Sequence, residues 1–274
     1  MMQLFSMAAL FLYLLSTAGY VSYLFLQKDV LHRAGWGLLG AGFLANLAAI
    51  LYEFMAAGRF PVGNLQETLS VAACTLAGLF LVFQHRYRLR VLGVYAAPLV
   101  ALIMAVSVQL PRAPSQMEIV FNNFWIIFHV VVIFIGNAAF ALAAGAGILY
   151  LMQESAIKGK NHGFFFHRLP SLNLLDTVGY ASIVVGFTMF TLGLITGFLY
   201  AKTVWGRFWS WDPKEVWSGV MWLFYAALLH ERLATGWRGR KAAIMSIVGF
   251  GVLLFTFLGV NFLLTGHHGA FTRW

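Results

Sequence analysis

The chain has 274 residues, of which 61% are hydrophobic and 10% are charged, and its formal net charge is +9. A soluble protein with so few charges would precipitate, so the composition predicts an integral membrane protein and excludes a soluble enzyme or binding domain. The basic residues lie in short loops between apolar runs, where lipid headgroups and topology account for them. The positive charge therefore does not indicate a nucleic-acid partner.

Eight apolar runs are each a candidate for crossing the bilayer, which takes about 20 helical residues. The first lacks the basic start and small-residue cleavage pattern of a signal peptide, so we expect it to be a membrane helix. The fifth is so long that it must tilt or project beyond the bilayer. We predict an all-α integral membrane protein, a bundle of about eight transmembrane helices that forms a single polytopic domain over residues 1–274. The runs cover residues 4–26, 35–57, 68–84, 91–110, 121–152, 174–201, 214–231 and 242–265.

Lysine and arginine are distributed unequally between the two sets of loops. One set holds 12 of the 18 basic residues, and the other set, with the termini, holds 6. Cytoplasmic loops carry the excess of basic residues, so the richer set is predicted to be inside. Both termini and the connection between the sixth and seventh helices are then extracytoplasmic.

The predicted outer connection contains an unusual cluster of tryptophans. The stretch WGRFWSWDPKEVW, residues 205–217, holds four of the nine tryptophans of the chain. An interfacial aromatic belt explains one or two of them, but not four. Asp-Pro-Lys-Glu at 212–215 has the pattern of a helix start, with Asp212 as N-cap, Pro213 at N1 and Glu215 at N3. Whether Asp212 only begins this helix or also has a direct functional role stays open.

The rest of the cluster predicts a surface for a flat aromatic ligand. In an extended chain Trp205, Arg207, Trp209 and Trp211 would share one face, and in a helix Trp205 and Trp209 would lie one turn apart. In either case indole rings lie beside cations, which suits a planar π-system with carboxylates such as haem. We predict that this external loop, at about 202–217, binds haem b. The predicted binding residues are Trp205, Arg207, Trp209, Trp211, Asp212, Lys214 and Trp217.

Histidines near the same membrane level are candidate haem ligands. His129 lies near the outer end of the fifth predicted helix, and His267 and His268 follow the eighth. Neutral imidazoles on opposite sides of an iron porphyrin would give bis-histidine ligation. His230 differs, because it lies about 25 Å along the seventh helix towards the inner leaflet. An ionisable group within a span is a functional candidate, so His230 is either a second ligand site or an inner-interface residue.

These residues resemble the "WWD" signature of haem-handling proteins in cytochrome c maturation. Within that group the chain is similar to the CcsA/ResC family, a subunit of the System II cytochrome c synthase. RFPVGNLQETL (59–69), WIIFHVVV (125–132), LLHER (228–232) and NFLLTGHHG (261–269) resemble further segments of that family. The family usually has Gly-Leu-His-Ser-Tyr after its last helix, whereas this chain has Gly-His-His-Gly-Ala at 266–270. The resemblance favours His268 as the ligand and keeps His267 as the alternative.

The resemblance implies a cytochrome c biogenesis function with haem as cargo. Haem would be held by His129 and His268, and its vinyl groups would be joined to the thiols of a CxxCH motif in apocytochrome c. The family's CcsB/ResB-type partner, which carries another transmembrane histidine and an external domain, would complete the synthase. Cys74 is the one cysteine of the chain, so substrate thiols would be reduced by another system. The resemblance implies a bacterial plasma membrane rather than a thylakoid membrane, and no general base stands out beyond the weak candidates Glu67 and Asp212.

Two other functions fit parts of the pattern. A b-type electron-transfer cytochrome would use histidine pairs inside the bundle, whereas most candidate ligands here are external. A small-molecule transporter could use residues 205–217 as an outer gate, and would then be indifferent to the loss of His129 or His268.

Overall fold

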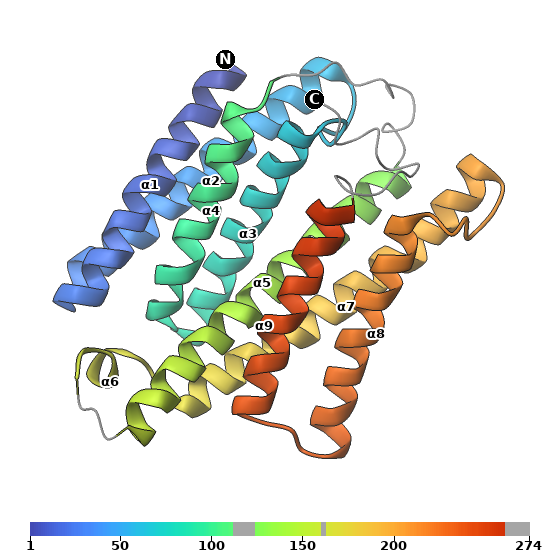
Figure 1. The fold of residues 1–274 in the computed structure, drawn as a ribbon. Coiled ribbons are helices and arrows are strands. Elements are labelled where there is room, and N and C mark those ends of the chain that lie inside the picture. Colours follow the sequence, from blue (N-terminus) through green and yellow to red (C-terminus); the bar gives the residue numbers. More distant parts are fainter. Residues whose placement is uncertain (112–123, 160–162, 261–274) are drawn as a thin grey trace.

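The computed structural model describes residues 1–111, 124–159 and 163–260, and within these it leaves the side chains of residues 204 and 205 undescribed. The described residues are all-helical, as predicted (Figure 1). The helices are α1 (Met2–Leu26), α2 (Asp29–Ala57), α3 (Leu65–Tyr87), the 3₁₀ turn η1 (Arg90–Leu92), α4 (Gly93–Gln109), α5 (Phe124–Lys158), α6 (Phe164–Arg168), α7 (Leu172–Trp205), α8 (Pro213–Ala234), α9 (Arg240–Leu254) and the π-helical turn η3 (Phe255–Gly259).

Local sequence signals account for where several of these helices begin and end. Asn64 caps α3 by accepting a hydrogen bond from the backbone N–H of Glu67, and Ser171 caps α7 in the same way through Leu174. Gly58 directly follows α2 and Gly206 directly follows α7, both in the left-handed region, at φ 64° and φ 73°. Glycine adopts this conformation without steric cost, which is why it follows so many helix ends.

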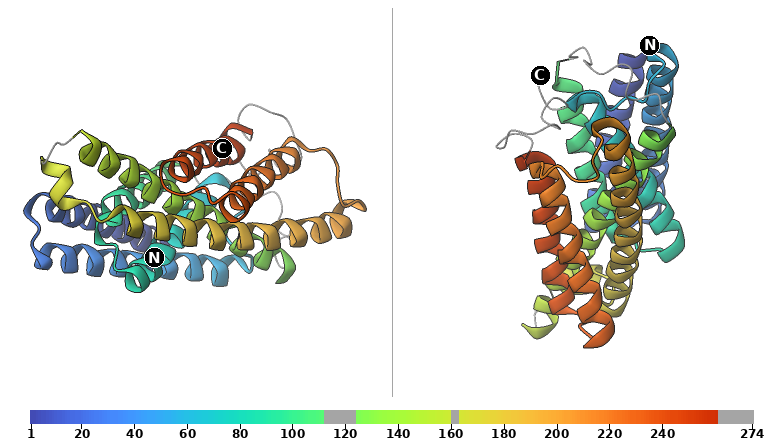
Figure 2. Two further views of the ribbon diagram at one scale, coloured as in Figure 1. Left: turned by 90° about the horizontal axis from the view of Figure 1, so that it is seen from below. Right: turned by 90° about the vertical axis from the view of Figure 1, so that its right-hand side faces the viewer.

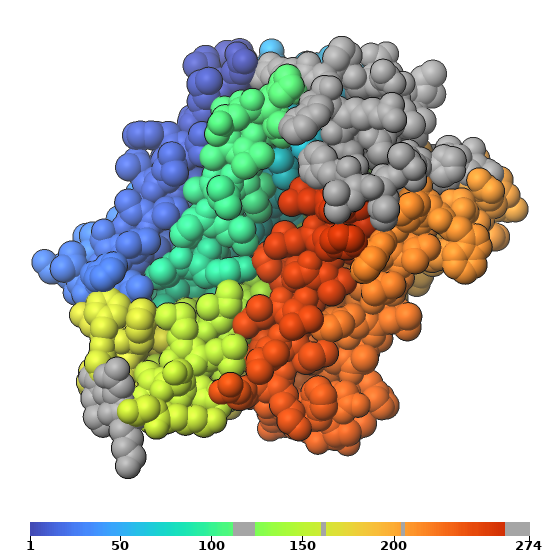
Figure 3. Space-filling view, viewed as in Figure 1, coloured from blue at the N-terminus to red at the C-terminus, as the bar shows by residue number. Residues whose placement is uncertain are grey.

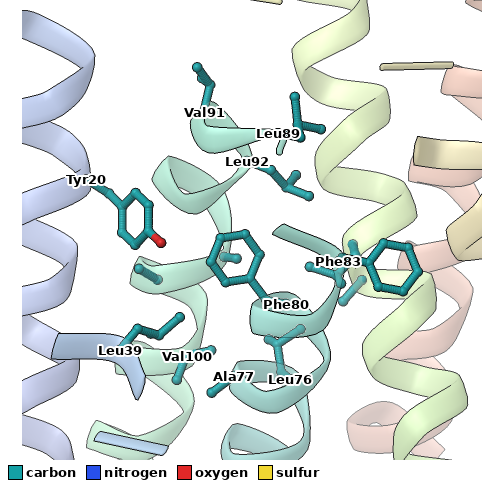
Figure 4. Packing of buried hydrophobic residues seen from close by; sticks show 14 of the residues in the cluster. Tyr20, Leu39, Leu76, Ala77, Phe80, Phe83, Leu89, Val91, Leu92 and Val100 are labelled. Atoms are coloured by element: carbon teal, nitrogen blue, oxygen red, sulfur yellow. The ribbon is translucent and has the colours of Figure 1, made fainter. Parts of the chain in front are cut away.

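The bundle has two groups of helices that meet along α5. Helices α1 to α4 pack on one another, and their shared core is built from large side chains such as Tyr20, Phe80 and Leu92 (Figure 4). On the other side α5 pairs along its length with α7, while α8 and α9 lie together on one side of α7 (Figure 2). The space-filling view shows α4 and α9 exposed on the same face, with α8 beyond α9 (Figure 3).

Helix α5 can occupy the centre because its middle is made of small residues. Its buried stretch at 138–147 reads AAFALAAGAG, and it contacts α3, α7 and α9. Small side chains let helix backbones approach closely, which is the main way that helices associate in a membrane. The stacked rings of Phe140 and Tyr225, 3.5 Å apart, join the same stretch to α8.

Seven helical segments in the described part of the chain are long and apolar enough to cross a membrane. They correspond to seven of the eight predicted spans, and the protein is a multi-pass membrane protein. The remaining predicted span, 214–231, forms helix α8, but its apolar stretch is weaker. The reason is visible in the sequence, since α8 begins with Lys214 and Glu215 and ends with His230, Glu231 and Arg232.

Alternation of the helices places the connections at two ends of the bundle (Figure 1). The α1–α2, α3–α4 and α8–α9 connections lie at one end, which we call the inner end because its loops are those predicted to be cytoplasmic. Met1, the α2–α3 connection, the start of α5 and the α7–α8 connection lie at the other, the outer end. The Trp-rich connection and His129 therefore occupy the same end.

Candidate functional site

His129 projects from the outer part of α5 onto α7. Its Nδ1 lies 2.7 Å from the carbonyl oxygen of Gly193. A carbonyl oxygen can only accept, so Nδ1 carries the proton and the lone pair of the ring is on Nε2. The ring is half-buried and sits directly over Gly197, where an added Cβ would lie 2.8 Å from its Cε1 atom. This is the tautomer and anchoring expected of an imidazole that offers Nε2 to a metal.

Helix α7 also connects His129 to the Trp-rich loop. Phe198 follows Gly197, and its ring packs against Trp209 with ring centroids 5.8 Å apart. Phe255, in the turn η3, packs edge-on against Trp217 at 4.6 Å. Ring contacts at the outer end thus join α7 to the loop and the start of α8 to the turn η3.

Trp209 and Trp211 have opposite environments. Trp209 is half-buried, and its indole Nε1 is buried without a hydrogen-bond partner in the described part of the chain. Trp211 is 78% exposed and has φ 59°, which is unusual for a bulky residue. The two rings are 5.6 Å apart and nearly perpendicular. They therefore do not form the single flat face that the extended conformation required.

The loop is a turn rather than a strand or a helix. Helix α7 ends at Trp205, and the chain reverses at Gly206, whose carbonyl oxygen accepts a hydrogen bond from Lys202 Nζ at 3.1 Å. Lys202 also lies over the ring of Phe208. The extended and helical alternatives are both wrong for this stretch, because a left-handed residue at each end interrupts any regular repeat.

The predicted helix start at 212–215 is confirmed, with one difference. Asp212 is buried and accepts the backbone N–H of Lys214 at 2.9 Å, and Pro213 is the first residue of α8. Glu215 does not complete a capping box with Asp212. Its carboxylate instead accepts the backbone N–H and the hydroxyl of Ser210, at 2.8 and 2.9 Å. Glu215 thereby ties the loop to α8.

The other predicted site residues are distributed as follows. Arg207 is exposed at the outer end, and Lys214 and Trp217 are partly buried in the first turns of α8. Trp205 ends α7, but its side chain is outside the described part. His267 and His268 also lie outside the described residues. His230 is exposed near the inner end of α8, so it does not lie with His129.

Glu67, a weak candidate for a general base, has its carboxylate engaged in an ion pair and hydrogen bonds that hold the chain together. Its carboxylate forms a two-point ion pair with Arg59, at 2.8 and 3.0 Å. It also accepts the backbone N–H of Gly63 and the side-chain amide of Asn64. With its oxygens used in this way and 4% of the residue exposed, Glu67 stabilises the α2–α3 connection.

Sequence reasoning missed the part of α7 that receives His129. Gly193, Thr196 and Gly197 were not singled out, although Gly-Leu-Ile-Thr-Gly at 193–197 is a G-x-x-x-G pattern in an apolar helix. That pattern marks a close helix–helix approach, so it could have predicted which face of α7 meets a neighbour. It could not have shown that the neighbour was His129.

Comparison with known proteins identifies the family. A family model described as "Cytochrome C assembly protein" matches residues 62–268, most of the chain. The chain belongs to the cytochrome C assembly protein family. Proteins named "Cytochrome c biogenesis protein CcsA" are similar to it, from Prochlorococcus marinus (strain MIT 9312) and Synechococcus sp. (strain JA-2-3B'a(2-13)). They are 34% and 30% identical over 80% and 89% of this chain, and over 78% and 87% of their own sequences.

A solved structure shares the fold of this cytochrome C assembly protein. The structure named "Cytochrome c Heme Lyase CcmF" superimposes with a TM-score of 0.68 at 16% identity. The match covers 98% of this chain and 48% of that one, so the chain spans about half of its length. At this identity the match concerns the fold alone.

The function of the chain is cytochrome c biogenesis, and the electron-transfer and transporter hypotheses are set aside.

Proposed function

We propose that the chain presents haem at the outer membrane face for covalent attachment to apocytochrome c. In this proposal His129 and His268 are the axial ligands of the haem iron, with His267 as the alternative to His268, and the Trp-rich loop lies against the porphyrin. The observation that carries the proposal is the anchored ring of His129, whose Nδ1–H is held by Gly193. The helix that holds it, α7, leads directly into the loop.

The residues of the loop suit a carboxylate-bearing aromatic ligand. Trp209 has a buried indole N–H without a partner among the described residues, and such a donor is costly unless a ligand satisfies it. Trp211 offers an exposed ring, and Arg207 and Lys214 are cations within four residues of it in the sequence. The contacts of Trp217 with Phe255 and of Asp212 with Lys214 hold the loop in place. Trp205 is the remaining member of the proposed haem-binding residues.

The chemistry left to this chain is mainly positioning. Each attachment adds a thiol S–H across a haem vinyl group, so a carbon–sulfur bond forms, the proton ends on the neighbouring carbon, and no net oxidation occurs. Holding the two groups in contact contributes several kcal/mol through effective molarity, on the order of 7 kcal/mol in favourable cases. Glu67 and Asp212 are engaged in structural hydrogen bonds, so we assign neither as a base.

The wider assembly follows from the same family relationship. We propose that a CcsB/ResB-type membrane subunit completes the synthase, that apocytochrome c is the second substrate, and that another system reduces its thiols. The exposed His230 would bind haem on its way from the cytoplasm, with a further ligand from that subunit. We propose eight spans, including α8, with both termini outside, in a bacterial plasma membrane.

The experiment that tests the proposal is an absorption spectrum of the chain purified alone and with its partner subunit. His129→Ala and His268→Ala should each lose bound haem and lower the yield of holocytochrome c. His85→Ala, at the exposed inner end of α3, is the matched control and should resemble the wild type. Wild-type spectra and yield in both ligand variants would refute the ligand assignment.

A further inference from the structure

The ring of His129 packs against two glycines of α7. Gly193 and Gly197 are one turn apart on the face of α7 that meets α5. A Cβ added at Gly193 would lie 2.3 Å from Ile133 Cδ1, and one added at Gly197 would lie 2.8 Å from His129 Cε1. Each glycine therefore receives one side chain of α5, and His129 and Ile133 are themselves one turn apart. We call Gly193, Thr196 and Gly197 the histidine socket.

The carbonyl oxygen of Gly193 is the polar centre of the socket. It accepts the His129 Nδ1–H at 2.7 Å and the hydroxyl of Thr196 at 3.0 Å. The Thr196 hydroxyl also lies 2.9 Å from the carbonyl oxygen of Leu192, so its single proton is shared between two acceptors. Its oxygen is 3.5 Å from His129 Nδ1, a longer contact than the 2.7 Å between Nδ1 and Gly193. Thr196 is only 6% exposed, so these polar groups face one another away from solvent.

We propose that the histidine socket sets both the direction and the donor strength of the His129 imidazole towards haem iron. This inference rests on the proposed function, and it assigns positioning roles to Gly193, Thr196 and Gly197. A hydrogen bond from the distal ring nitrogen fixes ring orientation and makes the ligating nitrogen more basic. A more basic ligand favours the ferric state, so the socket also tunes the reduction potential of the bound haem.

Thr196 moderates this effect because it competes for the same acceptor. While its hydroxyl donates to Gly193, that carbonyl oxygen is a weaker acceptor for His129. Removing the hydroxyl strengthens the remaining hydrogen bond, whereas displacing the ring removes that bond. The socket therefore predicts opposite changes of potential from two neighbouring substitutions, which a general loss of packing would not produce.

Gly197→Ala tests the direction of the ring. The added methyl group forces the imidazole away from Gly193, so haem retention by the purified complex should fall about 10-fold or more, in the range of second-shell effects on metal affinity. The residual haem should have a raised reduction potential and an altered Soret band. Gly251→Ala is the matched control, because an added Cβ there meets nothing within 4 Å. It should retain haem with the wild-type spectrum.

Thr196→Val tests the donor strength with little change of volume. Haem should be retained, and its reduction potential should shift to lower values, opposite in sign to the shift in Gly197→Ala. Thr196→Ser keeps the hydroxyl and should restore the wild-type potential. This pair also keeps the inference testable if Gly197→Ala fails to fold. An unchanged potential in Thr196→Val, or equal shifts in the Val and Ser variants, would overturn it.

Including His129→Ala in the same preparations separates the two proposals. If His129→Ala keeps wild-type haem, the ligand assignment itself is refuted. If His129→Ala loses haem while Gly197→Ala and Thr196→Val keep the wild-type spectrum and potential, only the socket is refuted.

Discussion

The two ends of α8 differ in how completely their polar groups are satisfied. At the inner end Arg232 forms a two-point ion pair with Asp176 of α7, at 3.0 and 2.6 Å. Asp176 also accepts the backbone N–H of Gly239, and the guanidinium lies over the ring of Tyr180. At the outer end Trp211 is strained and exposed, and the indole N–H of Trp209 has no partner among the described residues.

This difference separates a part that stabilises the bundle from a part that we propose binds a ligand. The inner cluster fixes α8 against α7 and the α8–α9 connection, although α8 makes less extensive contact with its neighbours than α5 does. The outer loop keeps one strained residue and one unsatisfied donor, and such groups cluster at functional sites, which agrees with the haem-binding role that we propose for it. Four substitutions test the comparison.

Asp176→Ala should have the largest effect. It leaves the Arg232 guanidinium, whose side chain is only 8% exposed, without its partner, and breaking a buried pair in this way costs about 3–5 kcal/mol. Thermal unfolding in detergent should show a large loss of stability. Asp29→Ala is the control, because it removes the exposed Asp29–Arg90 pair and should cost less than about 1 kcal/mol. Equal losses would mean that the inner cluster does not hold α8.

Trp209→Ala should affect both stability and binding. The substitution removes the ring that packs on Phe198 and Trp211, so we expect a loss of about 2–3 kcal/mol and of bound haem. Haem content and melting temperature should be measured on the same preparation. Normal haem content would indicate that Trp209 serves only packing at the interface.

Asp212→Ala should cost about 1 kcal/mol, because it removes the N-cap of α8. Asp212→Asn retains an acceptor oxygen and should recover most of that stability. Ser171→Ala removes the cap of α7 at the inner end and is the positional control. If haem retention falls in Asp212→Ala but not in Ser171→Ala, the outer cap also orders the binding loop. Equal retention in the two would assign Asp212 to helix initiation alone.

Trp211→Gly should have the smallest effect on stability. It is the one substitution of the four that is expected to leave stability unchanged or to raise it. Glycine relieves the positive φ, worth about 1–2 kcal/mol for other residues, and loses about 0.5–1 kcal/mol through its greater freedom in the unfolded chain. We expect an unchanged or slightly raised melting temperature together with reduced haem retention. A clear fall in melting temperature would show that Trp211 stabilises the loop and is not kept only for ligand binding.

The sequence by itself determined the spans and the elements that carry the site. Hydrophobic runs predicted α1, α3, α4 and α7 to within four residues at each end, because an apolar helix of this length is stable in a bilayer. They predicted α2 except for its first six residues, which include Asp29, His32 and Arg33. Asp-Pro-Lys-Glu predicted the start of α8 because capping is a local interaction. The motifs around His129 and Trp205–Trp217 likewise indicated cytochrome c assembly before any packing was known.

Only the tertiary structure decided how these elements meet. His32 follows a basic loop in the sequence, yet it lies half-buried among α1, α2 and α3, with Nε2 2.7 Å from the side-chain amide of Gln84. The partners of Glu67, the opposite environments of Trp209 and Trp211, and the fit of His129 over Gly197 depend on residues distant in sequence. Such contacts are chosen by the close packing of whole helices, which a local pattern does not encode.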